Sequence, residues 1–599
     1  MAKEKLRSEI KDCYKWDLNQ MYKSTKYINE DIKKALELTN KFGKYKGKIL
    51  KSSSNLLNVI ETYYELSRVI EKLAVYSTLN FNEDMNDTNK QTLKGRIDKL
   101  ISEISPAISF FTPELMESSF DDILKFIKEE KKLEKYKFIL EKIFREKEHI
   151  LSLKEEELLS NLSEIFEISS NTFRIINNVD LKFDSIYDEN NDLVDLNTSN
   201  YNKYIASFDR EVRISTFNSL YKGFESFSNT FAETLKGDIK TNCFISKIRN
   251  YNNPLEMSLF DDNISVDLYN KLIEKVNNSN HLIHKYMKAR LDVLKLDEIH
   301  MYDISVPLIK SLDKEYTFEK AKEIIINALS PLGEEYISDL KKLFESKMID
   351  VFNNKNKRSG AYSQGCYDSL PYISLNFEGK FNDVSTLAHE LGHSMHTFYS
   401  VKYREAHDYS YPIFLAEIAS TVNEILLNKY CFENAKTKEE KLYFLNNLLD
   451  EMRTTLFRQT MFAEFEKTIY EKELNNEVLT TETLCNIYLE LNKKYYGPDV
   501  ISDDYIKYEW SRIPHFYYSF YVYKYATGIS VAASIATNIF EGKKDTLNNY
   551  LEFLKSGNKN YPLDTLKTCG IDIVNDDTID KALLLFDNTL EEFIKIYNS

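Results

Sequence analysis

Turn-forming residues are scarce in this chain. Only 15 of its 599 residues are glycine and 10 are proline, whereas the two together usually make up roughly 12% of a protein. Sandwiches, propellers and collagen-like folds need more of these residues, so we exclude them. Hydrophobic residues make up 43% and aromatic residues 13%, which is ample for a packed core. The composition therefore predicts a mainly α-helical protein with two or three domains or one large multi-lobed fold.

The chain also lacks an excess of basic residues and a long apolar run. It has 79 Lys and Arg against 94 Asp and Glu, a formal net charge of -15 at pH 7. A nucleic-acid binder needs a basic surface, so we expect no nucleic-acid partner. No apolar run reaches the roughly 18 residues that a membrane-spanning helix needs. We therefore expect no spanning helix and no membrane partner.

Paired cysteines are absent as well. The six cysteines are scattered along the chain, and none of them forms a CxxC pair. This distribution favours neither a disulfide framework nor a cysteine zinc site. The first residues, MAKEKLRSEIKDCYKW, do not contain the apolar core of a signal peptide. We therefore expect a protein of the reducing cytoplasm.

Helical periodicity dominates what is present. Between residues 56 and 79, apolar residues recur three and four positions apart, which is the spacing of one helix face. The same kind of pattern predicts further helices over 125–153, 155–175, 207–247, 265–295, 317–345, 384–400, 412–432, 437–475, 481–495 and 514–540.

Two stretches depart from this helical pattern. Residues 372–377 read YISLNF and follow a glycine-containing loop, so they predict a short strand. Residues 177–198 are rich in Asn and Asp and predict a loop or hairpin. The loop-like sequence ends near residue 200. We therefore expect an N-terminal helical lobe over 1–200 and a second domain over 201–599.

The strongest functional signal lies in the run VSTLAHELGHSMHTFYS, residues 384–400. His389 and His393 are four positions apart, so on a helix they share one face and can bind the same metal ion. Glu390 follows the first histidine directly. This is the HExxH arrangement of zinc enzymes, in which the glutamate acts as general base toward water at the metal.

A catalytic zinc ion needs three protein ligands and one open position. His396 is the local candidate for the third, but seven residues of one straight helix rise about 10 Å, which makes a poor tetrahedron. The segment 411–430 predicts a second helix with Glu417 in its apolar first half, where a carboxylate needs a partner. We therefore favour Glu417. Ser420 and Glu424 share its helix face and are candidates for orienting the ligating histidines.

The residues around these positions resemble oligoendopeptidase F, one of the thimet oligopeptidase-like zinc metallopeptidases. The resemblance is carried by HELGHSMHTFYS and FLAEIASTVNE, and by RQTMFAEFE, YYGPDV and EWSRIPHFYYSFYVYKYATG further on. KWDLNQMY and KLAVYSTLNFNEDMND near the N-terminus extend it over nearly the whole chain. It implies a mainly α, two-lobed helical metallopeptidase with a deep central channel and a small β-sheet beside the zinc helix.

The resemblance also implies the activity and the roles of four residues. Oligopeptides would be cleaved at internal bonds by water that one Zn²⁺ per chain activates. The family's zinc ligands fall on His389, His393 and Glu417, and its general base falls on Glu390. The domain over 201–599 would then be the catalytic zinc-peptidase domain.

A downstream histidine and tyrosines hold the tetrahedral intermediate in this family. By resemblance these catalytic residues are His515, Tyr521 and Tyr525. Relatives often carry another tyrosine three positions further on, where this chain has Gly528. The tyrosine assignment therefore stays open, with Tyr518 and Tyr523 as alternatives.

The strand over 372–377 precedes the predicted zinc helix directly. We expect its exposed edge to pair with an extended peptide substrate, and the 360–365 loop to close over that peptide. Two other hypotheses fit the sequence: the protein is a helical HExxH metallocarboxypeptidase, or it is a non-catalytic peptide-binding protein. The intact HExxH run speaks against the latter. The sequence leaves the oligomeric state open.

Overall fold

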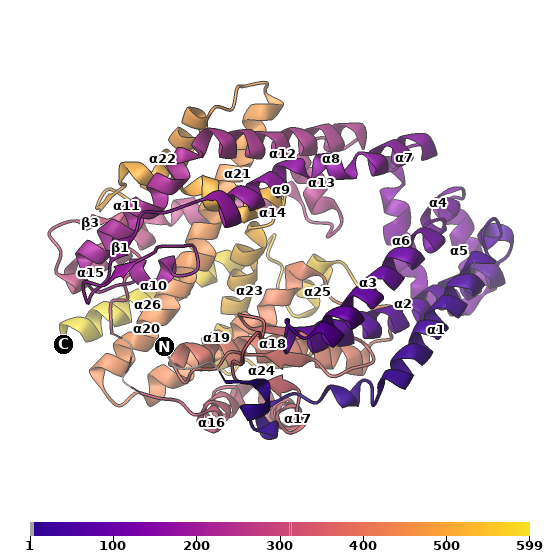
Figure 1. Cartoon of the computed structure of the whole chain (residues 1–599), viewed down its shortest axis with the longest axis horizontal. Coiled ribbons are helices and arrows are strands. Elements are labelled where there is room, and N and C mark those ends of the chain that lie inside the picture. The colour runs from indigo at the N-terminus through magenta and orange to yellow at the C-terminus, as the bar shows by residue number, and fades with distance from the viewer. Residues whose placement is uncertain (1–4, 311, 313) are drawn as a thin grey trace. The chain divides into compact units, whose positions relative to one another are not determined.

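The computed structural model describes residues 5–310, 312 and 314–599 of the chain (Figure 1). Helices account for most of these residues, and the strands are two or three residues long. The predicted mainly α fold is therefore confirmed. Within the described residues, no helix has both the length and the apolar character that crossing a bilayer requires.

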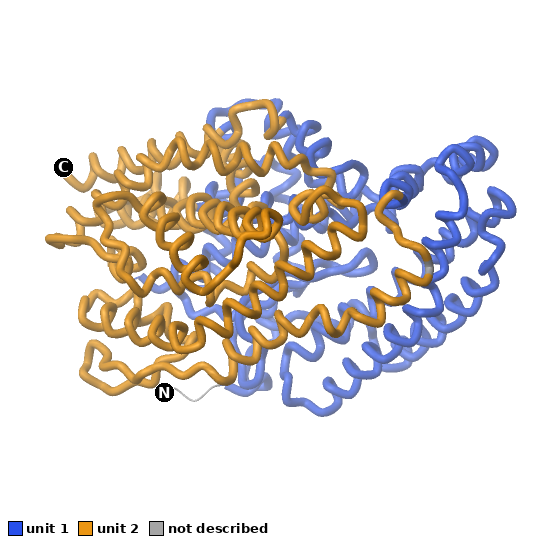
Figure 2. The backbone as a smooth tube through the Cα atoms, turned by 90° about the horizontal axis from the view of Figure 1, so that it is seen from above, with its two compact units in different colours: residues 1–147, 314–427, 538–570 blue, residues 148–313, 428–537, 571–599 orange. Residues whose placement is uncertain are grey.

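The chain forms two compact units (Figure 2). Unit 1 contains residues 1–147, 314–427 and 538–570, and unit 2 contains residues 148–313, 428–537 and 571–599. Each unit is therefore built from three separate segments. The expected division near residue 200 falls inside unit 2. It stays a prediction, because a compact unit need not fold on its own.

Unit 1 is built around long amphipathic helices. Helix α2 begins after Ser52, whose hydroxyl accepts a hydrogen bond from the Asn55 backbone at 3.2 Å, and this caps the helix. Its apolar side, including Leu56 and Val59, packs with Phe42 of α1 in one core. The helices of this unit are α1 (Thr25–Gly43), α2 (Ser53–Asn82), α3 (Thr88–Ile108), α4 (Phe111–Met116), α5 (Phe120–Glu129), α6 (Lys137–Arg145), α16 (Phe318–Ala328), α17 (Gly333–Glu345), α18 (Phe381–Tyr403), α24 (Lys544–Leu554) and α25 (Pro562–Thr568).

Unit 2 is also helical. Three of its predicted helices are in fact pairs, and the helix predicted over 155–175 is divided into three short helices. The stretches 207–247, 265–295 and 437–475 are each interrupted, the last by a π-helical turn at Arg453–Phe457. The unit contains α7 (Leu153–Asn161), α8 (Ser163–Phe166), α9 (Ile168–Ile175), α10 (Tyr201–Ile205), α11 (Arg210–Ser226), α12 (Ser228–Ile248), α13 (Pro254–Phe260), α14 (Val266–Asn278), α15 (Asn280–Leu294), α20 (Lys438–Met452), α21 (Arg458–Leu474), α22 (Thr481–Tyr496) and α26 (Thr578–Asn598). The unit boundaries at 427 and 537 fall inside α19 (Ile413–Asn434) and α23 (Tyr523–Phe540).

The strands form three small sheets. Strands β1 (Ile186–Tyr187) and β2 (Leu193–Val194) pair antiparallel, so the hairpin predicted within 177–198 is present. Strands β3 (Ile299–His300) and β7 (Val500–Ile501) form a parallel pair in unit 2. The third sheet belongs to unit 1 and has the order β4 (Ile349–Asp350), β6 (Tyr372–Ser374), β5 (Tyr362–Gln364).

The strand predicted over 372–377 exists as β6, but its expected environment is wrong. It is the central strand, parallel to β4 and antiparallel to β5, and its residues are buried. It therefore offers no exposed edge. The segment 360–365, expected as a closing loop, contributes β5, which is an outer strand. Sequence alone predicted the strand but not which neighbours would pair with it.

A buried ion group holds this sheet. The Asp350 carboxylate on β4 accepts hydrogen bonds from Lys357 at 2.7 Å and from Arg7 at 2.5 Å. Lys357 also donates to the backbone carbonyls of Leu375 at 2.6 Å and Phe352 at 2.8 Å. Burial alone would raise the pKa of Asp350, but the two cations outweigh it and lower that pKa. Through Lys357, the group therefore connects β4 to the segment that precedes β5 and to the segment that follows β6.

We expect Asp350→Asn to lower the free energy of unfolding by about 3–5 kcal/mol, because it leaves two cations without their buried partner. The folded-state pKa of Asp350 lies below its unfolded value of about 3.9. Its contribution is therefore fully present above about pH 4 and is lost as the pH falls from there through the lower folded-state pKa. Urea unfolding between about pH 7 and about pH 3 measures both effects. The variant should lose less stability on acidification than the wild type.

Asp12→Asn is the matched control, since the Asp12 side chain is 92% exposed and pairs only with Lys15, at 3.1 Å, on the surface of the described structure. An exposed ion pair contributes little, so this variant should unfold like the wild type. Equal destabilisation by the two substitutions would contradict the role given to the buried group.

Candidate metal centre

Two histidines of α18 approach each other closely. His389 and His393 are one helical turn apart, and their Nε2 atoms lie 3.2 Å from each other. Their side chains are 28% and 19% exposed, so both are shielded and still accessible. The spacing predicted from the sequence thus brings the two imidazoles to one point of unit 1.

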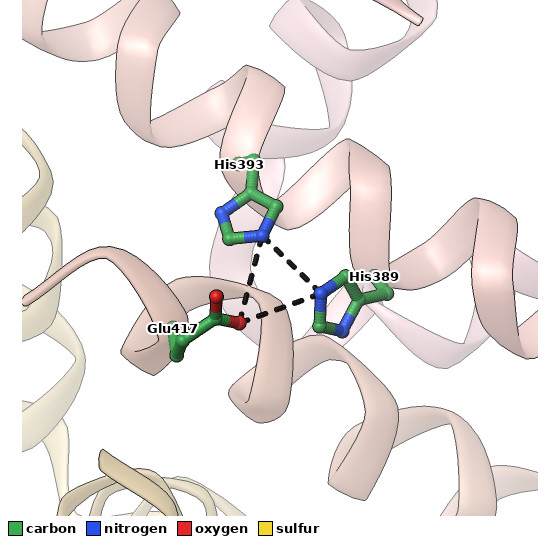
Figure 3. A group of neighbouring side chains, drawn as sticks. All are labelled: His389, His393 and Glu417. Atoms are coloured by element: carbon green, nitrogen blue, oxygen red, sulfur yellow. Dashed lines mark hydrogen bonds and ion pairs between the residues drawn. The ribbon is translucent and has the colours of Figure 1, made fainter. Parts of the chain in front are cut away.

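Glu417 of α19 reaches the same point. Its Oε2 lies 3.5 Å from His389 Nε2 and 3.7 Å from His393 Nε2 (Figure 3). In the described part of the chain, these three residues are the one group of histidine, cysteine or carboxylate side chains placed to hold a metal ion. Glu417 therefore converges with the histidines as the sequence analysis favoured.

The spacing of the three atoms fits a zinc ion. With zinc–ligand bonds of about 2.0–2.2 Å, neighbouring corners of a tetrahedron lie roughly 3.3–3.6 Å apart. The separations of 3.2, 3.5 and 3.7 Å are close to this range. Two imidazoles and one carboxylate, with a fourth position open, is also a donor set of catalytic zinc sites.

Gly392 allows the two helices to come this close. A Cβ atom at this position would lie 2.4 Å from the Cα atom of Ser420 and 2.7 Å from the carbonyl oxygen of Ala419. Both contacts are with the backbone of α19, which cannot move aside as a flexible side chain does. Any larger residue at 392 must therefore push α18 and α19 apart.

Further groups of α18 and α19 orient the three candidate ligands. His389 Nδ1 lies 2.8 Å from Glu424 Oε2, and the ring of His393 bonds to the backbone carbonyl of Ala416. Such partners direct the other ring nitrogen toward a metal. The Ser420 hydroxyl donates to the Glu417 carboxylate at 3.3 Å. Glu424 thus contacts a histidine as expected, whereas Ser420 contacts the carboxylate.

His396 is not part of this group. It is fully buried, and its ring stacks on Tyr411 with centroids 3.6 Å apart and lies 5.0 Å from the ring of Phe553. Burial and the nearby charge of His393 lower its pKa to about 3. The structure places His396 in an aromatic pocket of unit 1, where it packs against side chains.

Negative side chains crowd the site around Glu390. Burial, with Glu417 and Glu424 adding to it, raises the pKa of Glu390 to about 7, although His389 opposes the shift. Burial opposes the charge of His389, but Glu424 and Glu417 outweigh it and raise that pKa to about 9. Burial and the charge of His389 lower the pKa of His393 to about 4. The site therefore contains three carboxyl groups and little positive charge to balance them.

The remaining predicted catalytic residues gather in unit 2. The ring of His515 lies 6.2 Å from that of Tyr521 and 5.9 Å from that of Tyr525, between centroids. Tyr518 lies 6.1 Å from His515 and is 52% exposed. Tyr523 is fully buried and packs on another tyrosine of the core. Of the two alternatives, Tyr518 therefore shares the cluster and Tyr523 does not.

The local structure of this cluster differs from its prediction. A single helix was expected over 514–540, but α23 begins at Tyr523, after a short 3-10 helix at Pro514–Tyr517. Between them, Ser519 and Phe520 have φ angles of 40° and 57°. Apolar periodicity cannot reveal such a turn, because neither residue is the glycine that usually marks one.

Comparison with known proteins matches this architecture and these motifs. Residues 204–585 match the model of peptidase family M3, and residues 114–183 match that of oligopeptidase F. The chain belongs to peptidase family M3.

Relatives of this peptidase align with nearly all of its residues. It is 38% identical to oligopeptidase PepF of Bacillus subtilis, over 98% of this chain and 88% of that protein. It also resembles the crystal structure of oligoendopeptidase-F from Enterococcus faecium, with 36% identity, a TM-score of 0.75 and coverage of 96% and 99%. A structure from Chlamydophila abortus has 36% identity, a TM-score of 0.91 and coverage of 99% and 100%.

These relationships confirm the resemblance to oligoendopeptidase F, and the M3 chain is a metalloendopeptidase. Two contributors to the candidate site were missed from its sequence. Gly392 was detectable as a glycine inside a helical run of a glycine-poor chain. The Ala416 carbonyl was not, since a backbone group carries no side-chain signal.

We expect Gly392→Ala to lower the free energy of unfolding by about 1–3 kcal/mol, since the added methyl group overpacks two helix backbones. It should also reduce the zinc content of the purified protein, because Glu417 moves away with α19. Urea unfolding and metal analysis measure the two effects.

Gly95→Ala is the matched control, because a Cβ there meets nothing within 4 Å and Gly95 is exposed on α3. Alanine should raise stability by about 0.5–1 kcal/mol at such a helix position. Unchanged stability and zinc content in the Gly392 variant would contradict the close-contact account.

Proposed function

We propose that the chain is a zinc-dependent oligoendopeptidase that hydrolyses internal bonds of short peptides. One Zn²⁺ per chain would be held by His389, His393 and Glu417. The observation that carries this proposal is the convergence of three ligand atoms with separations of 3.2, 3.5 and 3.7 Å. A zinc ion held there would supply a Lewis acid for water and for the peptide carbonyl.

Glu390 is the general base of the proposed reaction. It follows a candidate ligand directly in α18, and it is 7% exposed. Its carboxylate takes the proton of the attacking water and later transfers it to the leaving amine. Glu424 and the Ala416 carbonyl support the reaction indirectly, because they hold the two imidazoles in the orientation that leaves Nε2 for the metal.

His515, Tyr521 and Tyr525 are proposed to stabilise the oxyanion of the tetrahedral intermediate. The resemblance to the family suggests this role, and their clustering in unit 2 supports it. Burial and the charge of Arg458 lower the pKa of His515, so its ring is neutral at neutral pH. A neutral imidazole donates an N–H, and each such donor contributes about 3 kcal/mol to the transition state.

The substrate is proposed to bind as an extended peptide along β5. This strand is an outer strand of its sheet, and the hydroxyl of its Ser363 lies 2.8 Å from that of Ser394 on α18. An outer strand can pair with a peptide backbone. We further propose a cytoplasmic location, since no two cysteines of the described chain are joined in a disulfide.

Glu390→Gln should retain zinc, because the residue is not a ligand, and should lower kcat about 10²–10⁴-fold, because the base is lost. Glu417→Gln should instead lower the zinc content. Metal analysis and peptide hydrolysis on the same samples separate the two effects. Normal turnover by the Glu390 variant would show that the assigned base is wrong.

A metallocarboxypeptidase with the same zinc site is the alternative. The two enzymes differ in their need for a free C-terminal carboxylate. We expect peptides blocked by N-acetylation and C-amidation to be cut internally, and a chelator to abolish this cleavage. Mass spectrometry of the products decides the question. Cleavage that stops on C-amidation, with single residues released from free peptides, would support the alternative.

A further inference from the structure

The turn before Tyr521 is strained. Ser519 and Phe520 adopt φ angles of 40° and 57°, in the left-handed region that residues other than glycine rarely occupy. Two such residues in succession persist only where the surrounding structure holds them. Neighbouring groups of unit 2 must therefore hold this turn.

Glu466 of α21 binds the turn directly. Its side chain is fully buried, and its Oε1 accepts a hydrogen bond from the Phe520 backbone N–H at 2.5 Å. On the other side, the Ser258 hydroxyl donates to the Ser519 carbonyl at 2.7 Å. The Phe520 ring packs on Tyr470, with centroids 4.6 Å apart. The strained backbone is thus held by a carboxyl, a hydroxyl and a ring.

Fold stability does not explain a carboxyl group at this position. No salt bridge to Glu466 is found, and its Oε2 has no hydrogen-bond partner in the described structure. Burial raises its pKa to about 8, so the group is neutral at neutral pH. A buried polar group that is only half satisfied destabilises a core. What the position provides is one acceptor for the Phe520 N–H.

We propose that Glu466 is a positioning residue that fixes the left-handed turn at 519–520 and thereby places Tyr521 beside His515. The turn is followed directly by Tyr521, whose ring lies 6.2 Å from that of His515 with 16° between their planes. Tyr521 also lies 5.4 Å from Tyr525. This inference rests on the proposed function, in which these residues stabilise the oxyanion.

The test compares Glu466→Leu, which removes the acceptor, with Glu466→Gln, which keeps an oxygen in its place. Misplacing a catalytic group by about 1 Å costs roughly 10²-fold. We therefore expect Glu466→Leu to lower kcat about 10–100-fold with KM changed less than about threefold, since the turn orients transition-state donors. Glu466→Gln should restore kcat to within about threefold of the wild type. Wild-type kcat in the Leu variant overturns the proposal.

Glu464→Ala is the control for general destabilisation. Glu464 lies on the same helix and accepts hydrogen bonds from Lys494, Tyr495 and Asn277, but it does not contact the turn. We expect this variant to lower the melting temperature at least as much as Glu466→Leu and to keep kcat. An equal fall of kcat in both variants would show that loss of stability alone explains the effect.

A double-mutant cycle with Tyr521→Phe separates this inference from the proposed function. If Glu466 acts through Tyr521, the double variant Glu466→Leu/Tyr521→Phe should lose less than the product of the two single effects. Fully multiplicative effects overturn the inference and leave the role of Tyr521 intact. Wild-type kcat in Tyr521→Phe alone overturns the role of that tyrosine, and the inference falls with it.

Discussion

The contact between α18 and α19 at Gly392 is the constraint on which the candidate site depends. Only a residue without Cβ lets the two backbones approach so closely, since an added carbon would lie 2.4 Å from Ser420 Cα. The approach places Glu417 within 3.7 Å of both imidazoles. The same contact brings Glu424 to His389. One glycine thus sets both the ligand geometry and the orientation of a ligand.

Charge explains why such an arrangement favours a cation. Glu390, Glu417 and Glu424 surround two imidazoles in a largely buried place. Burial, with the charges of Glu417 and Glu424 adding to it, raises the pKa of Glu390 to about 7. Uncompensated negative charge in a low-dielectric site is unfavourable. A divalent cation offsets the repulsion, so metal binding and folding of this part of unit 1 support each other.

Features of the site that depend on residues close together in the sequence could be predicted, whereas those that depend on contacts with other elements could not. His389 and His393 were predictable because an interval of four defines one helix face, and Glu417 because a carboxylate in an apolar helix needs a partner. The pairing of β6 on both sides was not, because β4 and β5 have only two and three residues, too few to show the alternating pattern of a strand. The turn at Ser519 and Phe520 was also missed, since the group that accepts a hydrogen bond from its Phe520 N–H is Glu466, on another helix.

We propose that His389, His393 and Glu417 together hold one zinc ion, and the proposed function depends on this ion. An anomalous-difference map, recorded at the zinc absorption edge from crystals of the zinc-loaded protein, tests it most directly. We expect one strong peak per chain at about 2.0–2.2 Å from both Nε2 atoms and a Glu417 oxygen. A peak bound by His396, or a Glu417 side chain directed away from the imidazoles, would contradict it.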